Sequence, residues 1–167
     1  MAVKDKVFKG KIKQKGIYDY KAFYEFVYDY LSEEEYEVHE SLYHETDKGD
    51  AKDLNIKWSA IKTISDYFQF EITLNWIILQ QKKVNLKKDG QEISMDSGTL
   101  EINFEATLIK DHENKWNSGF LKVLRDIYDE YIIRSRIDDY EVELFEEMND
   151  ITATIKSYLA IEGQHTV

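Results

Sequence analysis

The sequence predicts an α+β protein, in which an antiparallel meander of about six to seven strands packs against a short N-terminal helix and a long C-terminal helical region. Residues 67–80 and 100–108 place an apolar side chain at every second position, and residues 118–161 place them three or four apart. A strand turns alternate side chains to opposite faces, so the sheet has one continuous apolar face that the helices must cover. The apolar residues of the longest strand are Phe68, Phe70, Ile72, Leu74, Trp76 and Ile78.

The N-terminal residues predict a strand followed by a helix. Residues 5–14 carry scattered apolar side chains among lysines and are expected to form the first strand, which Gly16 ends. Asp19 is a suitable N-cap, because its carboxylate can accept a hydrogen bond from a free N–H of the first helical turn. The helix is expected to run from there to about Leu31, with its apolar residues on one face.

Two further strands precede the long one at 67–80. The first spans residues 36–46 and ends at a turn over residues 47–50, where Gly49 supplies the permissive backbone conformation. The second spans residues 54–60, and its alternation shifts near Ile61, either at a β-bulge or at the end of the apolar face.

A short hairpin and a final strand are expected after the long strand. Residues 84–86 lead into Asp89-Gly90, a strong two-residue hairpin signal, and residues 93–95 return. Residues 96–98, which read Asp-Ser-Gly, are expected to form another turn before the strand at 100–108. Because short turns join consecutive strands, the strands should pair as an antiparallel meander.

The C-terminal residues 118–161 keep a helical period. As one helix they would extend roughly 66 Å at 1.5 Å per residue, which is too long for one sheet. Either the helix breaks near Arg134–Arg136, or its end projects and meets a partner. Ser118 can cap the start of this region, and Gly163 is expected to end it.

This order of a strand, a helix, a series of strands and a C-terminal helix resembles the helix-grip superfamily, of START and plant-pollen-allergen type. In that fold a curved sheet wraps the C-terminal helix. The segment from Trp116 to Ile133, together with the meander before it, also resembles small uncharacterised proteins of archaeal genomes, and that resemblance implies no activity. Its most recognisable part reads Phe120-Leu121-Lys122-Val123-Leu124-Arg125-Asp126-Ile127-Tyr128-Asp129-Glu130-Tyr131-Ile132-Ile133.

Composition restricts the compartment and the partners. The chain has 167 residues, which predicts a single domain, and it has no cysteine, which rules out disulfides and thiolate metal sites. The formal net charge of −11 argues against nucleic acid as a partner. No run of about 18 apolar residues is present, so we expect no transmembrane segment and a cytoplasmic location.

Residue types that often serve in catalysis or metal binding occur here without the required spacing. His39 and His44 are five residues apart, which places them on opposite faces of a strand and predicts no metal site. No phosphate-binding glycine loop or nucleophile motif is visible, so the sequence favours a protein that is not an enzyme and needs no cofactor. An acidic group on the C-terminal helix is expected to be solvated; it comprises Glu141, Glu143, Glu146, Glu147 and Asp150.

The aromatic residues are the main candidates for binding a ligand. In the first functional hypothesis, a hydrophobic or amphipathic small molecule lies between the sheet and the C-terminal helix, where Tyr hydroxyls and Trp N–H groups orient it. The alternative for the same residues is ordinary core packing. The candidates are Trp58, Phe68, Phe70, Trp76 and Phe104 on the sheet, and Phe120, Tyr128 and Tyr131 on the facing helix.

The second functional hypothesis is a structural, assembly or adaptor protein. Its long C-terminal helix would pair with a second copy or with another protein through a regular apolar stripe. The stripe consists of Ile137, Tyr140, Leu144, Met148, Ile151, Ile155 and Tyr158.

Overall fold

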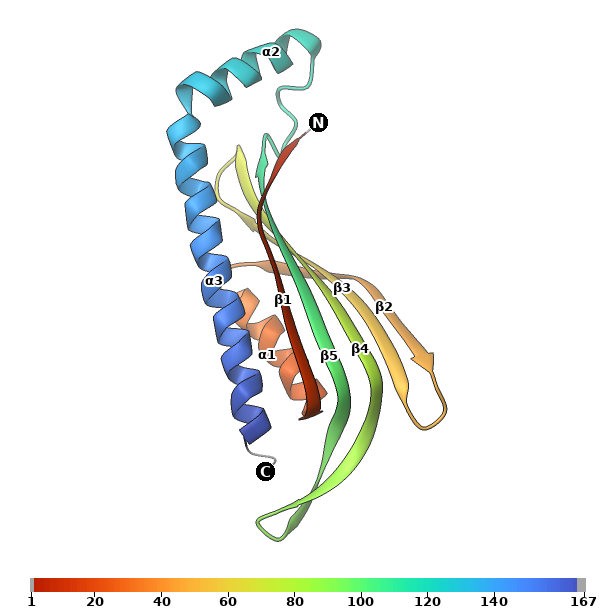
Figure 1. Ribbon diagram of the computed structural model, residues 1–167. Coiled ribbons are helices and arrows are strands. Elements are labelled where there is room, and N and C mark those ends of the chain that lie inside the picture. Colours follow the sequence, from red (N-terminus) through yellow and green to blue (C-terminus); the bar gives the residue numbers. More distant parts are fainter. Residues whose placement is uncertain (1, 165–167) are drawn as a thin grey trace.

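The computed structural model describes residues 2–164 and confirms the α+β class. Five strands form one sheet, and helices precede and follow its meander (Figure 1). In chain order the elements are β1 (Val3–Tyr18), α1 (Tyr20–Glu33), β2 (Glu37–Asp47), β3 (Lys52–Thr63), β4 (Phe68–Lys88), β5 (Gln91–Lys110), α2 (Gly119–Ile127), the π-helical turn η1 (Tyr128–Ile132) and α3 (Arg134–Gln164).

The sheet is antiparallel throughout, with the strand order β1-β5-β4-β3-β2. Strands β2 to β5 form the predicted meander, and β1 pairs with the far edge of β5. The sheet twists strongly, and the hairpin of β4 and β5 extends beyond the other strands (Figure 1). The predicted turns at Gly49 and at Asp89-Gly90 are confirmed, since all three residues have a positive φ at those positions.

The predicted number of six to seven strands is wrong, because the short hairpin is a continuation of β4 and β5. Residues 96–98 form no turn: Asp96 and Ser97 stay paired with β4, and Gly98 is paired with Gly16 of β1. A bulge between Leu79 and Lys82, with Gln80 at φ 57°, bends β4 without ending it. Gly98 lies against this bulge, where a Cβ would stand 2.8 Å from the carbonyl oxygen of Leu79.

The first strand is also longer than predicted. β1 continues through Gly16 to Tyr18, so Gly16 does not end it. Gly16 has φ 136°, a conformation that glycine adopts without strain, and it lies opposite Gly98 of β5. The predicted cap is confirmed, because the carboxylate of Asp19 accepts a hydrogen bond from Ala22 N at 3.0 Å.

One face of the sheet is apolar and is covered by two helices. All six alternating apolar residues of β4 are buried, as predicted. α1 packs its aromatic residues on β3 and β4, with the rings of Phe23 and Trp76 5.5 Å apart. α3 runs along β1 and β5 on the same side (Figure 1), so the core lies between the sheet and these helices.

The C-terminal helical region is broken, and the position of the break agrees with the prediction. The helix ends in the turn η1, and Ile133 then leaves the helical conformation with φ −116° and ψ 10°. Ile133 N still donates to Tyr128 O at 3.0 Å, the wide spacing of a π-turn. α2 therefore turns away from α3 and lies beyond the end of the sheet (Figure 1).

Candidate functional site

The five candidate aromatic residues of the sheet are all buried in the core. Trp58 and Trp76 pack against each other with ring centroids 4.9 Å apart. Phe68 and Phe70 contact Tyr140 of α3, at 4.8 Å and 6.2 Å. Phe104 is buried in the same cluster. The structure thus brings these rings together as the predicted inner face of the sheet.

Two of the three candidates from the helical region do not join them, whereas Tyr128 packs against the edge of the same cluster. Phe120 on α2 and Tyr131 on η1 are each 75% exposed. Tyr128 is half-buried beyond the end of the sheet, where its ring stacks on Trp116 at 5.5 Å and meets Tyr67 at 6.0 Å. The expectation that Phe120 and Tyr131 face the inner side of the sheet was wrong, because the break at Ile133 carries α2 and η1 away from it.

The predicted partner-binding stripe lies on the covered side of α3. Its members face the sheet and α1 of their own chain. Ile137, Leu144, Met148, Ile151 and Ile155 are buried, and Tyr140 and Tyr158 are partly buried against the same cluster. In this structure the stripe packs within the molecule.

The largest group of exposed apolar side chains lies on α2 and η1. We call this group the α2–η1 face. The positions 120, 123, 124, 127 and 131 recur every three or four residues, so they share one side of the helix. The exposed fractions range from 36% to 75%. The face consists of Phe120, Leu121, Val123, Leu124, Ile127, Tyr131 and Ile132.

Polar side chains, in contrast, attach the segment to the end of the sheet. Arg125 of α2 is only 7% exposed, and its Nη1 lies 3.8 Å from Oδ2 of the buried Asp111. Asp111 follows β5 and also accepts backbone hydrogen bonds from Lys115 N at 2.8 Å and from Trp116 N at 3.3 Å. One carboxylate thus fixes both the loop that enters α2 and the buried side of α2.

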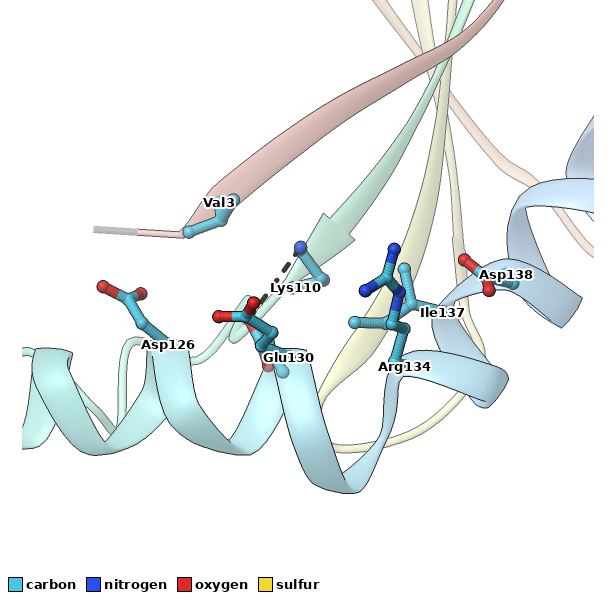
Figure 2. A pocket seen from close by; sticks show the side chains of 8 residues that line it. Val3, Lys110, Asp126, Glu130, Arg134, Ile137 and Asp138 are labelled. Atoms are coloured by element: carbon cyan, nitrogen blue, oxygen red, sulfur yellow. Dashed lines mark ion pairs between the residues drawn. The ribbon is translucent and has the colours of Figure 1, made fainter.

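A second attachment is made by Asp129 of η1. The hydroxyl of Tyr67 donates a hydrogen bond to the Asp129 carboxylate, and Lys110 Nζ lies 3.8 Å from Asp129 Oδ2 (Figure 2). Lys110 in turn pairs with Asp5 of β1 at 2.9 Å. Burial, together with the Asp129 carboxylate, raises the pKa of Tyr67, so its hydroxyl stays protonated and remains a donor.

A hollow of about 320 Å³ lies between this segment and the end of the sheet. Asp126 and Glu130 line it from the helical side, facing Val3 and Lys110 across it (Figure 2). Four acidic side chains and two basic ones line the hollow, and Lys110 lies 3.8 Å from one of the acids, Asp129. Within residues 2–164 no three His, Asp or Glu side chains are placed to hold a metal ion.

The orientation of α2 and η1 is the feature of the candidate site that the sequence did not predict. Amphipathic helices usually turn their apolar side to the protein and their polar side to water. Here Arg125 and Asp129 bind the protein, and the α2–η1 face is left in solvent. The periodicity of residues 120–131 predicts the existence of this face but carries no information on which side meets the sheet.

No family model, no curated protein and no solved structure matches the chain. In the described part of the chain, none of the helices has the length and apolar character needed to cross a membrane. The physical properties of the α2–η1 face are therefore the main basis for a functional assignment.

Proposed function

We propose that this chain is a non-enzymatic assembly protein that binds another protein through the α2–η1 face. The observation that carries the proposal is the reversed orientation of α2 and η1, which are attached by Arg125 and Asp129 while their apolar side chains stay exposed. Such an arrangement costs free energy in the isolated molecule, because apolar surface remains in water. The cost is recovered when a partner covers the face.

The size of the face supports this proposal. From the exposed fractions and the usual areas of such side chains, the seven residues present on the order of 700 Å². Contiguous apolar patches on monomeric proteins rarely exceed a few hundred Å², and larger ones mark interaction sites. Single exposed apolar residues elsewhere, such as Leu42 and Leu79, need no such explanation.

The charges around the face favour a protein over a lipid surface. Helices that lie on membranes are usually rich in lysine and arginine on their polar side. Here Arg125 is buried against Asp111, and Asp126 and Glu130 leave acidic groups beside the face. The formal net charge of −11 adds repulsion from anionic headgroups.

The test is a titration with Nile red, a neutral dye whose emission rises on apolar surface, at low micromolar protein. We expect a strong signal for the wild type and its loss in the triple variant Phe120→Ser, Ile127→Ser, Tyr131→Ser. The matched control replaces Val142 and Phe145, two exposed apolar residues of α3, by serine and should keep the signal. A triple variant that binds the dye like the wild type would contradict the proposal.

A second candidate function is the binding of a small molecule between the sheet and α3. The element order, and the seating of α3 on the apolar face, support a helix-grip type of fold, which we propose with it. One specific observation favours this candidate: Trp76 Nε1 and the Tyr18 hydroxyl are buried without a hydrogen-bond partner among the described residues. We place it second because ring contacts such as Trp58–Trp76 and Phe23–Trp76 occupy the interior.

Native mass spectrometry of the purified protein, together with dye displacement in the triple variant, tests this second candidate. An interior ligand should add mass to the folded protein and should displace a dye that binds independently of the α2–η1 face. A bare polypeptide mass with no displacement would reject it.

A further inference from the structure

We infer that the partner covering the α2–η1 face is a second copy of this chain, related by a twofold axis that sets the two α2–η1 segments antiparallel. This inference rests on the proposed function, because it names the occupant of the same face. It is carried by the area of the face, the distribution of charge along the segment and the position of α2 beyond the sheet.

The area fits a dimer. A standard interface buries roughly 800 Å² on each partner, and the exposed apolar side chains alone supply on the order of 700 Å². In a twofold interface the same patch serves both copies, so no second apolar patch of this size is needed elsewhere on the molecule. The polar rim then comes from the charged side chains that flank the face.

The charges favour the antiparallel arrangement. Lys122 is exposed in the first half of the segment, whereas Asp126 and Glu130 are exposed in the second half. Antiparallel pairing sets the basic half of one copy beside the acidic half of the other, and parallel pairing would set acid beside acid. The helix dipoles also oppose each other favourably in the antiparallel pair.

The position of α2 makes the pairing sterically accessible. α2 lies beyond the end of the sheet, so neither α3 nor the strands stand in front of it (Figure 1). Because the polar attachments hold Arg125 and Asp129 on the protein side, the face is ordered before a partner arrives. Preorganisation of this kind reduces the entropic cost of association.

A definite register follows from these constraints. An axis that passes between Arg125 and Asp126 sets Leu124 of one copy opposite Ile127 of the other, and Phe120 opposite Tyr131. The two Phe120 side chains then lie about 16 Å apart along the helix, at 1.5 Å per residue. In a parallel pair they would instead lie side by side.

Because the chain has no cysteine, introduced cysteines can test this register directly. With copper–phenanthroline as oxidant, and at submillimolar protein to offset the two lost side chains, the double variant Phe120→Cys, Tyr131→Cys should form a covalent dimer. The single variant Phe120→Cys should not, since a disulfide requires Cα atoms within about 7 Å. Efficient cross-linking of the single variant would overturn the antiparallel arrangement.

Sedimentation velocity of the uncross-linked full chain separates this inference from the proposed function. We expect the wild type to dimerise with rising concentration. In the Phe120→Ser, Ile127→Ser, Tyr131→Ser variant the dissociation constant of the dimer should be higher by about a hundredfold or more. The Val142→Ser, Phe145→Ser control should dimerise like the wild type, which shows that the loss is specific to the α2–η1 face. An unchanged circular dichroism spectrum of the triple variant excludes misfolding as the cause.

Each remaining outcome has one meaning. A wild type that stays monomeric at submillimolar concentration, yet binds Nile red through the α2–η1 face, overturns the second copy as partner and leaves the proposed function intact. If the monomer instead binds neutral phosphatidylcholine vesicles through this face, a lipid surface is the occupant, and both the second copy and the proposed protein partner are overturned. A wild type that neither dimerises nor binds the dye overturns both.

Discussion

Several features of the fold depend on single residues and cannot be read from local sequence patterns. Gly98 is one of them, because β5 passes so close to the bulge of β4 that a methyl group would meet the backbone. The nearest atoms to an added Cβ are Leu79 O at 2.8 Å and Gln81 Cα at 3.2 Å, and backbone atoms cannot rotate away as a side chain can.

We therefore expect Gly98→Ala to lower the free energy of unfolding by about 1–3 kcal/mol. Urea denaturation measures this change. Gly119→Ala is the matched control, because no atom lies within 4 Å of its added Cβ and alanine favours the helix, so its stability should be unchanged or raised by about 0.5–1 kcal/mol. Equal stability of Gly98→Ala and wild type would show that the two strands do not approach this closely.

The buried carboxyl of Glu162 should make the stability of the folded protein depend on pH. Burial raises its pKa above the usual value, although hydrogen bonds from the Asp19 backbone and the Tyr158 hydroxyl oppose the shift. The folded state thus holds the proton more tightly than the unfolded state, and stability falls as pH rises from the unfolded pKa through the folded pKa.

Glu162→Gln removes this loss, because the amide stays neutral and its oxygen can still accept both hydrogen bonds. We expect the variant to unfold at a higher temperature than the wild type at pH 7, and we expect the difference to disappear below about pH 4. Thermal unfolding between these values checks the sign. Glu146→Gln, on the exposed side of α3, is the control for the loss of one negative charge. A difference for Glu162→Gln that persists at low pH would contradict this role of Glu162.

At the scale of elements, the start of α1 is held by two carboxylates from different parts of the chain. Asp19 accepts from Ala22 N at 3.0 Å, and Asp96 of β5 accepts from Tyr20 N at 3.0 Å. Asp96 is buried and also pairs with Lys83 at 3.0 Å. It therefore connects the helix to the sheet as well as capping it.

We expect Asp19→Ala to cost about 1 kcal/mol, which is typical of a lost N-cap. Asp96→Ala should cost more, about 2–3 kcal/mol, because a partly buried N–H loses its acceptor and the charge pair with Lys83 is broken. Chemical denaturation of both variants provides the comparison, with Asp29→Ala on the exposed side of α1 as control. Should Asp96→Ala prove the milder change, the role assigned to Asp96 would be wrong.

The hydrogen bond from Tyr67 to Asp129 should help to hold α2 and η1 against the end of the sheet. Tyr67→Phe removes the hydrogen bond to Asp129 while keeping the aromatic contact with Tyr128. We expect amide hydrogen exchange in residues 119–132 to accelerate about tenfold, the equivalent of roughly 1.4 kcal/mol, with the strands unchanged. Tyr131→Phe, whose ring is exposed, is the control, and equal exchange in both variants would contradict the attachment.

The elements also show how far the sequence predicts the structure. Alternation from Phe68 to Ile78 correctly predicted the buried face of β4, because a strand with one buried face has an apolar residue at every second position. The bulge at Gln80 leaves no such mark, so β4 was divided into two predicted strands. Asp96 was assigned to a turn from the sequence Asp-Ser-Gly at 96–98. Its partner in the structure, Tyr20 N, is 76 residues away and cannot be inferred from local chemistry.

At the scale of the whole molecule, the sequence predicted the α+β class, the apolar sheet face and the covering by α3. The candidate site was predicted only in part. The aromatic core residues were correctly grouped, but Phe120 and Tyr131 were placed inside. A helical period defines an apolar side and not its direction. The direction depends on Asp111 and Tyr67, which the fold brings to the buried side of α2 and η1.

Association through the α2–η1 face requires that its apolar side chains point away from their own chain and toward a second copy. The most direct measurement is the rate at which a maleimide labels Ile127→Cys at low and high protein concentration. The reference is Val27→Cys, at a position of α1 that is buried in the hydrophobic core. We predict fast labelling at position 127 in dilute protein, slower labelling as the concentration rises, and slow labelling at position 27 throughout. If Ile127→Cys reacts as slowly as Val27→Cys even in dilute protein, α2 packs its apolar side on its own sheet, and the central claim is wrong.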